Sequence, residues 1–256
     1  TTNDSLSGGA GDDILVGNAG HNGLFGGGGK DIIFGGAGTD VILGGQDATT
    51  NHADWISRTD VFYDQIPGYP SIPGVLTNKT VTQYHTPGGD DDVIYAGAGQ
   101  DNVNGGADDD VIYGGDDNDL LQGDGSGRGR AWLAPEHHGD DYIFGEGGND
   151  GIEGDGGDDH LYGGEGNDWI NGDSIATNAG ADFAFHGNDT IHGGAGGDVI
   201  FGDSGSDFIS GDDGDDWIHG DGDDYRSFPD GSPIIDDGSY NGRDEIHGGN
   251  GNDTVQ

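Results

Sequence analysis

The chain of 256 residues contains no cysteine, no methionine, only seven basic residues and only seven prolines. Without cysteine it can form neither a disulfide scaffold nor a cysteine-ligated metal site. No apolar run approaches the 18 residues of a membrane-spanning helix. Nucleic-acid-binding surfaces are basic, whereas 50 acidic residues here give a net charge of −43. We therefore expect neither a membrane span nor a nucleic-acid partner.

Hydrophobic residues are also scarce, at 30% of the chain against the roughly 45–50% that is usual for globular domains. Glycine is abundant instead, with 59 residues. A chain with so little apolar content and so much net charge is typically disordered. Folding therefore requires a core built from few apolar side chains and a means of neutralising the carboxylates.

A nine-residue repeat, G-G-x-G-x-D-x-U-x with U aliphatic, accounts for most of the chain. It is plain in 8–16, 26–34, 35–43, 163–171, 193–201 and 248–256, and eighteen units follow the partial unit at Asp4. The eighth position is Leu, Ile or Val in every unit. The sixth is Asp in seventeen of the eighteen, with Asn22 as the exception. A low-complexity Gly/Asp linker would show no such phase, so the repeat is structural.

This unit resembles the RTX, or hemolysin-type, calcium-binding nonapeptide repeat. The resemblance covers the chain outside four insertions. It implies an all-β fold, a right-handed parallel β-roll or β-solenoid with two units per coil. Eighteen units would then form about nine coils of 18 residues. It also implies that the sixth-position aspartates and turn carbonyls bind calcium between successive coils.

The residues of the unit are consistent with such a roll. Glycine supports the tight turns of the first six positions because it adopts positive φ. The last three positions form a short strand in which the eighth side chain points to one face and its neighbours to the other. One such strand buries little, so units must stack to share a core.

Stacking brings sixth-position carboxylates of successive coils together, where unpaired like charges repel. A hard divalent cation with oxygen ligands relieves this repulsion, and calcium fits better than magnesium, which demands a stricter octahedron. Gaps flanked by two aspartates allow up to about fifteen ions, and metal binding would then drive folding. The candidate ligands are Asp13, Asp31, Asp40, Asp92, Asp101, Asp110, Asp119, Asp141, Asp150, Asp159, Asp168, Asp189, Asp198, Asp207, Asp216, Asp244 and Asp253.

Four insertions interrupt the repeat, at approximately 46–87, 124–138, 173–186 and 221–241. We interpret residues 1–256 as a single roll carrying these insertions. They recur every four units, always in odd-numbered units, so all four should leave one edge of the roll. The prediction of calcium sites is therefore stronger for the aspartates of the other edge than for those beside the insertions.

Odd-numbered units also carry outward aromatic residues at the ninth position, including Phe34, Tyr95, Tyr113, Phe144 and Tyr162. Such a row of apolar side chains is usually covered. Cover by the insertions is the first interpretation. Contact with another copy of the chain and a sugar-stacking platform are the others, and end-to-end association through open strand edges is a further route to assembly.

Motifs of catalytic type are weak. Gly202-Asp203-Ser204-Gly205 resembles the surroundings of a serine-protease nucleophile, but it lies in phase with the repeat and lacks triad partners. Glu136-His137-His138 could contribute to a transition-metal site, although a polar loop is the simpler interpretation. His21, His160, His192, His219 and His247 occupy repeat positions expected to be exposed.

The sequence therefore predicts a non-enzymatic, calcium-dependent module, secreted and extracellular or on a bacterial cell surface. It would serve as part of a surface layer, an adhesin or a fibre. The alternative is the calcium-binding region of a larger enzyme or toxin exported by a type I system, where it aids secretion and folding.

Overall fold

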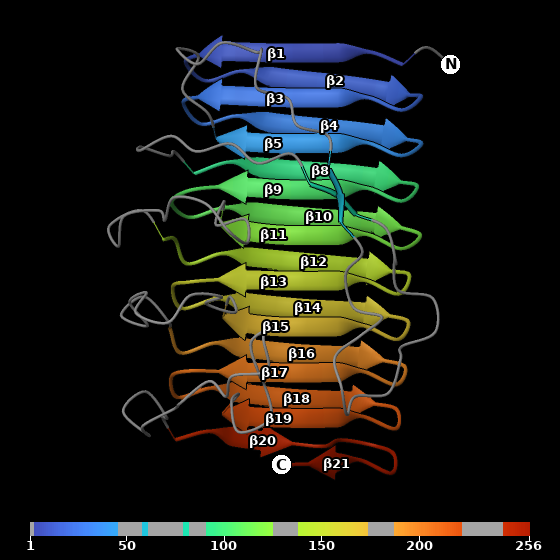
Figure 1. The fold of residues 1–256 in the computed structure, drawn as a ribbon, viewed down its shortest axis with the longest axis vertical. Coiled ribbons are helices and arrows are strands. Elements are labelled where there is room, and N and C mark those ends of the chain that lie inside the picture. Colours follow the sequence, from blue (N-terminus) through green and yellow to red (C-terminus); the bar gives the residue numbers. More distant parts are fainter. Residues whose placement is uncertain are drawn as a thin grey trace.

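The structure is a computed structural model that describes residues 3–45, 58–60, 79–81, 91–124, 138–173, 187–221 and 243–256. Two parallel sheets lie face to face, and the chain alternates between them along a single stack (Figure 1). The first and last described strands lie at opposite ends of that stack (Figure 1). The all-β prediction of a parallel β-roll is confirmed.

The ten-stranded sheet contains the strands of even-numbered units. In spatial order it comprises β1 (Ser5–Ala10), β3 (Gly23–Gly28), β5 (Val41–Gly45), β9 (Asn102–Gly106), β11 (Leu120–Asp124), β13 (Gly151–Asp155), β15 (Trp169–Asp173), β17 (Val199–Asp203), β19 (Trp217–Asp221) and β21 (Thr254–Val255).

The nine-stranded sheet contains the strands of odd-numbered units, one for each predicted coil. In spatial order it comprises β2 (Ile14–Ala19), β4 (Ile32–Ala37), β8 (Val93–Ala98), β10 (Val111–Asp116), β12 (Tyr142–Gly147), β14 (His160–Glu165), β16 (Thr190–Ala195), β18 (Phe208–Asp213) and β20 (Glu245–His247). A separate antiparallel pair joins β6 (Arg58–Asp60) to β7 (Lys79–Val81).

Strand register follows the repeat without slippage, including across the insertions. Ile33 lies opposite Ile94, and Ile112 opposite Ile143, although 61 and 31 positions separate each pair in the chain. Equivalent positions therefore form straight columns along the stack, so every column has one side chain per coil.

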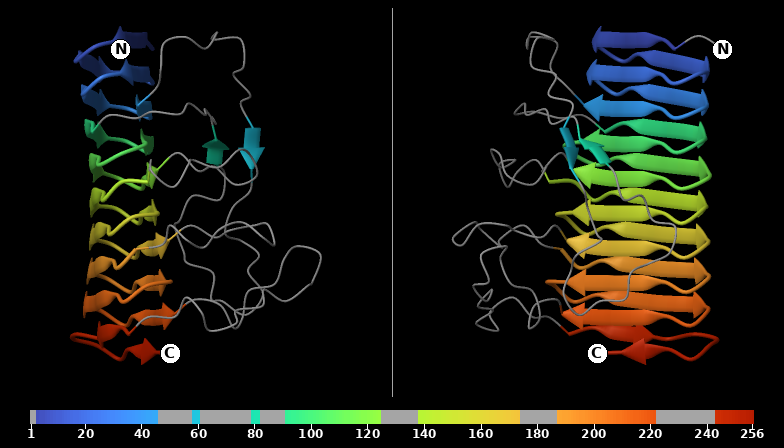
Figure 2. Two further views of the ribbon diagram at one scale, coloured as in Figure 1. Left: turned by 90° about the vertical axis from the view of Figure 1, so that its left-hand side faces the viewer. Right: turned by 45° about the vertical axis from the view of Figure 1, so that its right-hand side comes forward.

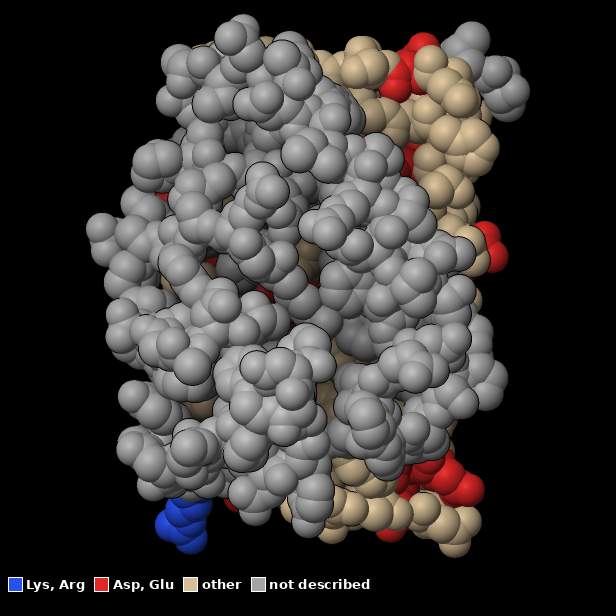
Figure 3. Space-filling model, viewed as in Figure 1, with Lys and Arg blue, Asp and Glu red and all other residues tan. Residues whose placement is uncertain are grey.

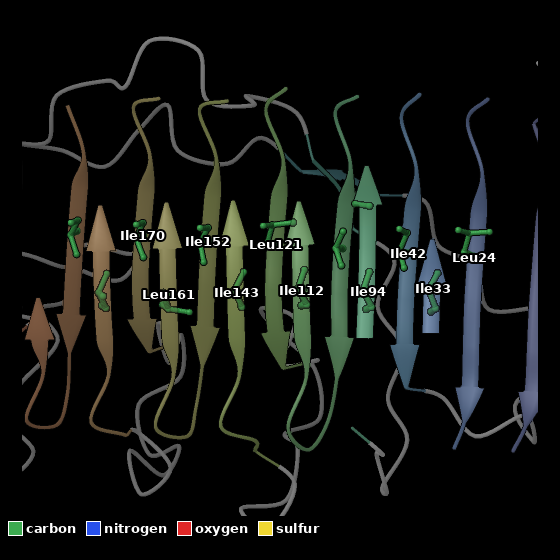
Figure 4. Packing of buried hydrophobic residues seen from close by; sticks show 14 of the residues in the cluster. Leu24, Ile33, Ile42, Ile94, Ile112, Leu121, Ile143, Ile152, Leu161 and Ile170 are labelled. Atoms are coloured by element: carbon green, nitrogen blue, oxygen red, sulfur yellow. The ribbon is translucent and has the colours of Figure 1, made fainter. Parts of the chain in front are cut away.

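The core is the double column of eighth-position aliphatic residues between the two sheets (Figure 4). From Leu24 to Ile218 these side chains are fully buried, at 0% exposure. At the ends of the stack the column is less enclosed, with Leu15 at 5% and Ile246 only partly buried. Burial depends on a coil on each side, which explains why the units must stack.

Among the residues that the structure describes, seven other than glycine adopt positive φ, and all lie at the second or fourth position of a unit. Most of the remaining second and fourth positions are glycines with φ between 97° and 158°. The turn therefore favours the left-handed region at these positions. In the described ranges, only Asn, Asp and Glu occupy it besides glycine, consistent with the tolerance of Asn and Asp for this region.

Each predicted insertion begins and ends in turns that lead from the ten-stranded to the nine-stranded sheet. Described strands end at Gly45, Asp124, Asp173 and Asp221 before the four insertions. We call this side of the roll the loop-bearing edge and the other side the uninterrupted edge. Most of the predicted insertion residues, among them Glu136 and His137, lie outside the described residues. Figure 2 shows the two edges as opposite margins of the stack.

The two outward faces differ in a way that the sequence did not indicate. On the nine-stranded sheet, Phe34 and Tyr95 are each 39% exposed and Tyr142 is 42% exposed. On the ten-stranded sheet, Phe25, Trp169 and Phe201 are buried. The ninth-position aromatic row is thus not fully covered, since Phe34 and Tyr95 are exposed and Tyr113, Phe144 and Tyr162 are half-buried. Most of the insertion residues that were expected to cover this row lie outside the described residues. His219, which also lies on the outward side of the ten-stranded sheet, is buried, although its repeat position was expected to be exposed.

Candidate metal centre: two columns of buried aspartates

Sixth-position side chains form two columns, one at each edge of the roll. We call these the aspartate columns. Odd-numbered units place their residues at the loop-bearing edge and even-numbered units at the uninterrupted edge. From Asp31 to Asp216 every sixth-position Asp is buried to within 2% exposure. Asp13, Asp244 and Asp253, near the ends of the stack, are partly exposed.

One carboxylate oxygen of each residue has a defined structural role. The backbone N–H of each sixth-position residue donates to Oδ1 of its counterpart in the next coil, as from Asp92 to Asp110 and from Asp150 to Asp168. The N···O distances lie between 2.5 and 3.2 Å along both columns. Carboxylate-to-backbone bonds therefore connect every pair of neighbouring coils.

The bonds continue across all four insertions. Asp31 donates to Asp92, Asp110 to Asp141, Asp159 to Asp189 and Asp207 to Asp244. The loop-bearing column is thus as continuous as the other, and the insertions do not displace the repeat geometry beside them.

The second carboxylate oxygen is different. Twelve sixth-position aspartates have a buried Oδ2 atom with no hydrogen-bond partner among the described residues: Asp13, Asp40, Asp101, Asp110, Asp119, Asp141, Asp150, Asp159, Asp168, Asp189, Asp198 and Asp216. Buried polar atoms normally have partners, and an unsatisfied charged oxygen is costly. A positively charged group beside these Oδ2 atoms would therefore stabilise the fold, and the same need recurs along both columns.

Glycine at the first position of each unit makes room beside this oxygen. A Cβ on Gly145 would lie 2.5 Å from Oδ2 of Asp150 and 2.4 Å from the carbonyl oxygen of Gly163 in the next coil. A Cβ on Gly193 would lie 2.4 Å from Oδ2 of Asp198. Each turn thus brings a carboxylate and a backbone carbonyl together at a place that no other residue could occupy.

Burial also raises the pKa values of these carboxyl groups in the metal-free chain. It raises the pKa of Asp119 to about 9, that of Asp150 to about 8 and that of Asp101 to about 7, with neighbouring aspartates adding to the rise. The cause is desolvation, which disfavours the charged form. Without a cation, the ionised columns oppose folding.

The donor set fits a hard divalent cation. Within the described ranges, no three His, Asp or Glu side chains come together closely enough to hold a metal by themselves. A cation in a turn would therefore need carbonyl oxygens as well as carboxylates. Mixed carboxylate and carbonyl ligation is typical of calcium.

Asn22 marks the weakest point of the uninterrupted column. Its Oδ1 accepts the backbone N–H of Asp4, as an aspartate would. Its Nδ2 then occupies the place of the second oxygen, 2.7 Å from a Cβ built on Gly17. An amide donor there repels a cation, so this turn is a poorer candidate for cation binding than the others.

The sequence analysis did not identify the second-position aspartates at the loop-bearing edge as candidate site residues. Asp124 and Asp173 are fully buried, Asp155 is 1% exposed and Asp203 is 7% exposed. We call these four the position-2 aspartates. The G-D pair at the start of units 9, 11, 13 and 15 was a visible signal, because it recurs only in odd-numbered units over this stretch.

Exposed acidic side chains lie at both edges of the roll. Asp116, Asp117, Glu146, Glu165 and Asp213 are exposed in the uninterrupted turns, and Asp109, Asp140 and Asp158 are exposed at the loop-bearing edge. Figure 3 shows acidic side chains along the margin of the uninterrupted turns. The described part of the chain therefore has exposed acidic residues as well as the buried columns.

These features define a class: a parallel β-roll whose turns carry columns of buried carboxylates. The family model for the RTX calcium-binding nonapeptide repeat matches residues 1–24, 17–50, 86–125, 138–161, 152–184, 186–209, 201–225 and 240–256. Since these ranges cover well over half of the chain, the protein belongs to this family of calcium-binding repeats. No curated protein matches the chain. The described part of the chain contains no helix that could span a membrane.

Proposed function

We propose that this protein is a non-enzymatic structural module that folds on binding calcium outside the cell. The observation that carries the proposal is the row of buried Oδ2 atoms without hydrogen-bond partners. Calcium between successive coils would neutralise them, with the seventeen sixth-position aspartates and turn carbonyls as ligands. The high calcium concentration outside cells suits modules whose Kd is about 10⁻⁴ to 10⁻³ M.

A calcium titration of metal-free protein, followed by circular dichroism, tests this function. We expect strand signal to appear with calcium and not with an equal concentration of magnesium, which demands a stricter geometry. Equilibrium dialysis gives the number of bound ions, for which up to about fifteen places exist between paired aspartates. Full strand signal in metal-free protein at neutral pH would refute the proposal.

The outward side of the nine-stranded sheet favours a structural role in an assembly. We call it the aromatic face. Its rings stack along the roll with centroids 4.8 to 5.4 Å apart and nearly parallel planes. This ladder consists of Phe34, Tyr95, Tyr113, Phe144, Tyr162 and His192. Because the ring planes face one another, they are not available to stack on a sugar.

A second copy of the chain is the occupant we propose for this face. The chain has a net charge of −43, so most of its surface repels another copy. The outward seventh and ninth positions of the first eight strands of this sheet contain no acidic residue. Two copies can therefore meet here without opposing carboxylates, and a flat apolar face of this kind is typical of interaction sites.

Light scattering of the calcium-loaded protein tests the assembly. Tyr95→Ser combined with Tyr113→Ser should reduce the mass to that of a monomer, whereas Asp213→Ser on the uninterrupted edge should not. A monomeric calcium-loaded wild type would contradict lateral assembly. It would favour the alternative, a folding and secretion aid within a larger protein exported by a type I system.

A further inference from the structure

The aromatic face changes in character along the roll, from apolar at one end to polar at the other. Each strand of the nine-stranded sheet presents its seventh-position and ninth-position side chains outward. At the apolar end, the four outward side chains of β2 and β4 are 38% to 71% exposed: Ile14, Val16, Ile32 and Phe34. The last strand, β20, instead presents Glu245 and His247. This gradient constrains how a second copy can bind.

The polar end begins at β16. Up to β14 the ninth position is Val, Phe or Tyr, and from β16 onward it is His192, Ser210 and His247. His192 Nδ1 lies 3.2 Å from Oδ2 of Asp212, and His247 Nε2 lies 3.1 Å from Oε1 of Glu245. In the two outward rows of the nine described strands, Glu245 is the only acidic residue. A second copy therefore meets a carboxylate at one end of this face alone.

Two copies related by a two-fold axis can bring their aromatic faces together in two orientations. In the antiparallel orientation the strand order is reversed, so that β2 of one copy opposes β20 of the other when the faces overlap fully. In the parallel orientation each strand opposes the same strand of the second copy. The parallel register is fixed, because a two-fold axis along the roll permits no sliding.

Side-chain chemistry distinguishes the two orientations. Full antiparallel overlap would place Glu245 against Ile14, where the carboxylate loses water and gains an apolar neighbour, which is costly. In the parallel orientation, Ile14 and Val16 oppose β2 of the second copy. Glu245 then opposes the strand that carries His247. Apolar side chains thus meet apolar ones, and each glutamate has an imidazole nearby.

The area of the face also favours the parallel orientation. Nine strands at a spacing of about 4.8 Å give a face roughly 40 Å long, and two outward residues per strand give a width of about 13 Å. Each copy would then bury on the order of 500 Å², or about 1,000 Å² in total, near the lower limit for a specific interface. An antiparallel dimer that shifts along the roll to keep Glu245 in water loses part of this area, whereas the parallel dimer keeps all of it.

We propose that two copies of the chain pair in parallel through the aromatic face, with a two-fold axis along the roll and each strand of the nine-stranded sheet opposite its own counterpart. The inference rests on the proposed function, since it takes a second copy as the partner of this face. It adds the orientation of that partner: both rolls run in the same direction. The loop-bearing edge of each copy then lies beside the uninterrupted edge of the other.

Distances between identical spin labels test the orientation. The chain contains no cysteine, so a single introduced cysteine can be labelled specifically. Ala19→Cys, Ala37→Cys and Ala195→Cys, made separately, are matched sites. Each replaces an exposed third-position alanine at the uninterrupted edge, next to β2, β4 and β16 respectively, and outside the two outward rows. Pulsed electron paramagnetic resonance of the calcium-loaded full chain measures the distance between the two labels of a dimer.

The parallel dimer predicts the same distance for all three variants, because every coil has the same relation to the axis. In an antiparallel dimer, moving the label by one strand changes the separation along the roll by two strand spacings, or about 10 Å. The three distances then cannot all be equal. Unequal distances therefore overturn the parallel orientation while self-association stands.

Two further outcomes concern the face itself. Adding Tyr95→Ser and Tyr113→Ser to Ala37→Cys should abolish the dipolar signal, and a signal that persists would mean that the copies meet elsewhere, which overturns the inference. Absence of a dipolar signal in all three single variants, together with a monomer mass by light scattering, overturns the lateral assembly of the proposed function. Calcium-dependent folding, followed by circular dichroism, is measured separately and is unaffected by either result.

Discussion

At the scale of single residues, glycine is required for two separable reasons. Gly9 and Gly27 occupy the same repeat position, with φ of 107° and 116°. A Cβ on Gly9 would meet nothing within 4 Å, whereas one on Gly27 would lie 2.0 Å from the carbonyl oxygen of Gly9 in the preceding coil. The first glycine needs only conformational freedom, while the second also needs space.

This difference predicts the outcome of two substitutions. Gly9→Ala should destabilise the calcium-loaded protein by about 1–2 kcal/mol, the cost of positive φ for a residue with a Cβ. Gly27→Ala should cost about 4 kcal/mol or more, because backbone atoms of two coils must separate. Denaturant unfolding in saturating calcium measures both. Equal losses would show that close stacking of the turns is not a constraint.

At the scale of the strand and turn, much of the roll could be predicted from the sequence. The invariant aliphatic eighth position fixes which side of each strand faces inward, and its period sets the register. The same phase correctly marked the sixth-position aspartates as a column. The Oδ1 bonds between coils could not be foreseen, because they depend on the backbone of the neighbouring turn.

The errors have physical reasons at this scale too. Composition alone does not reveal which outward face is covered, so cover by the insertions was the first interpretation for the aromatic face, whereas Phe201 on the opposite face is the residue that is buried. The position-2 aspartates were overlooked because Asp, like Gly or Asn, tolerates the left-handed region that Asp155 and Asp203 adopt in the turn. Second-position aspartates are buried at the loop-bearing edge, as for Asp155, and partly exposed at the uninterrupted edge, as for Asp212, and this difference is a property of the folded roll.

Asn22 offers a gain-of-function test of the uninterrupted column. Asn22→Asp replaces the amide donor by a second carboxylate oxygen and should add calcium-binding capacity between Asp4 and Asp40. We expect the calcium midpoint of folding to fall and the metal-free protein to become less stable, since it gains a buried charge. Asn18→Asp, an exposed second-position change, is the control. If the midpoint does not fall, the column does not bind cations through Oδ2.

At the scale of the whole molecule, the net charge of −43 acts mainly through the buried columns. Outer carboxylates are hydrated and screened by salt, whereas the columns are not. The roll is therefore stable only when protons or cations reach these oxygens. Either protons or cations can neutralise these carboxylates. A change of pH should therefore shift the stability of the metal-free protein and that of the calcium-loaded protein in opposite directions.

Consider first the metal-free chain. Burial raises the folded-state pKa of Asp168 to about 6, that of Asp198 to about 7 and that of Asp119 to about 9. An unfolded aspartate has a pKa of about 3.9, so over this interval the folded state binds more protons than the unfolded state. Its stability therefore falls as pH rises from about 4 to about 9. Mild acid should partly replace calcium.

The calcium-loaded protein should behave in the opposite way, because protons compete with the ion for the same carboxylates. We expect thermal stability in excess calcium to fall as the pH is lowered from 8 to 5, while strand signal in metal-free protein rises over the same range. Circular dichroism on protein dialysed free of calcium is the measurement, since a chelator would itself titrate here. Parallel trends in the two states would mean that calcium does not bind at the buried columns.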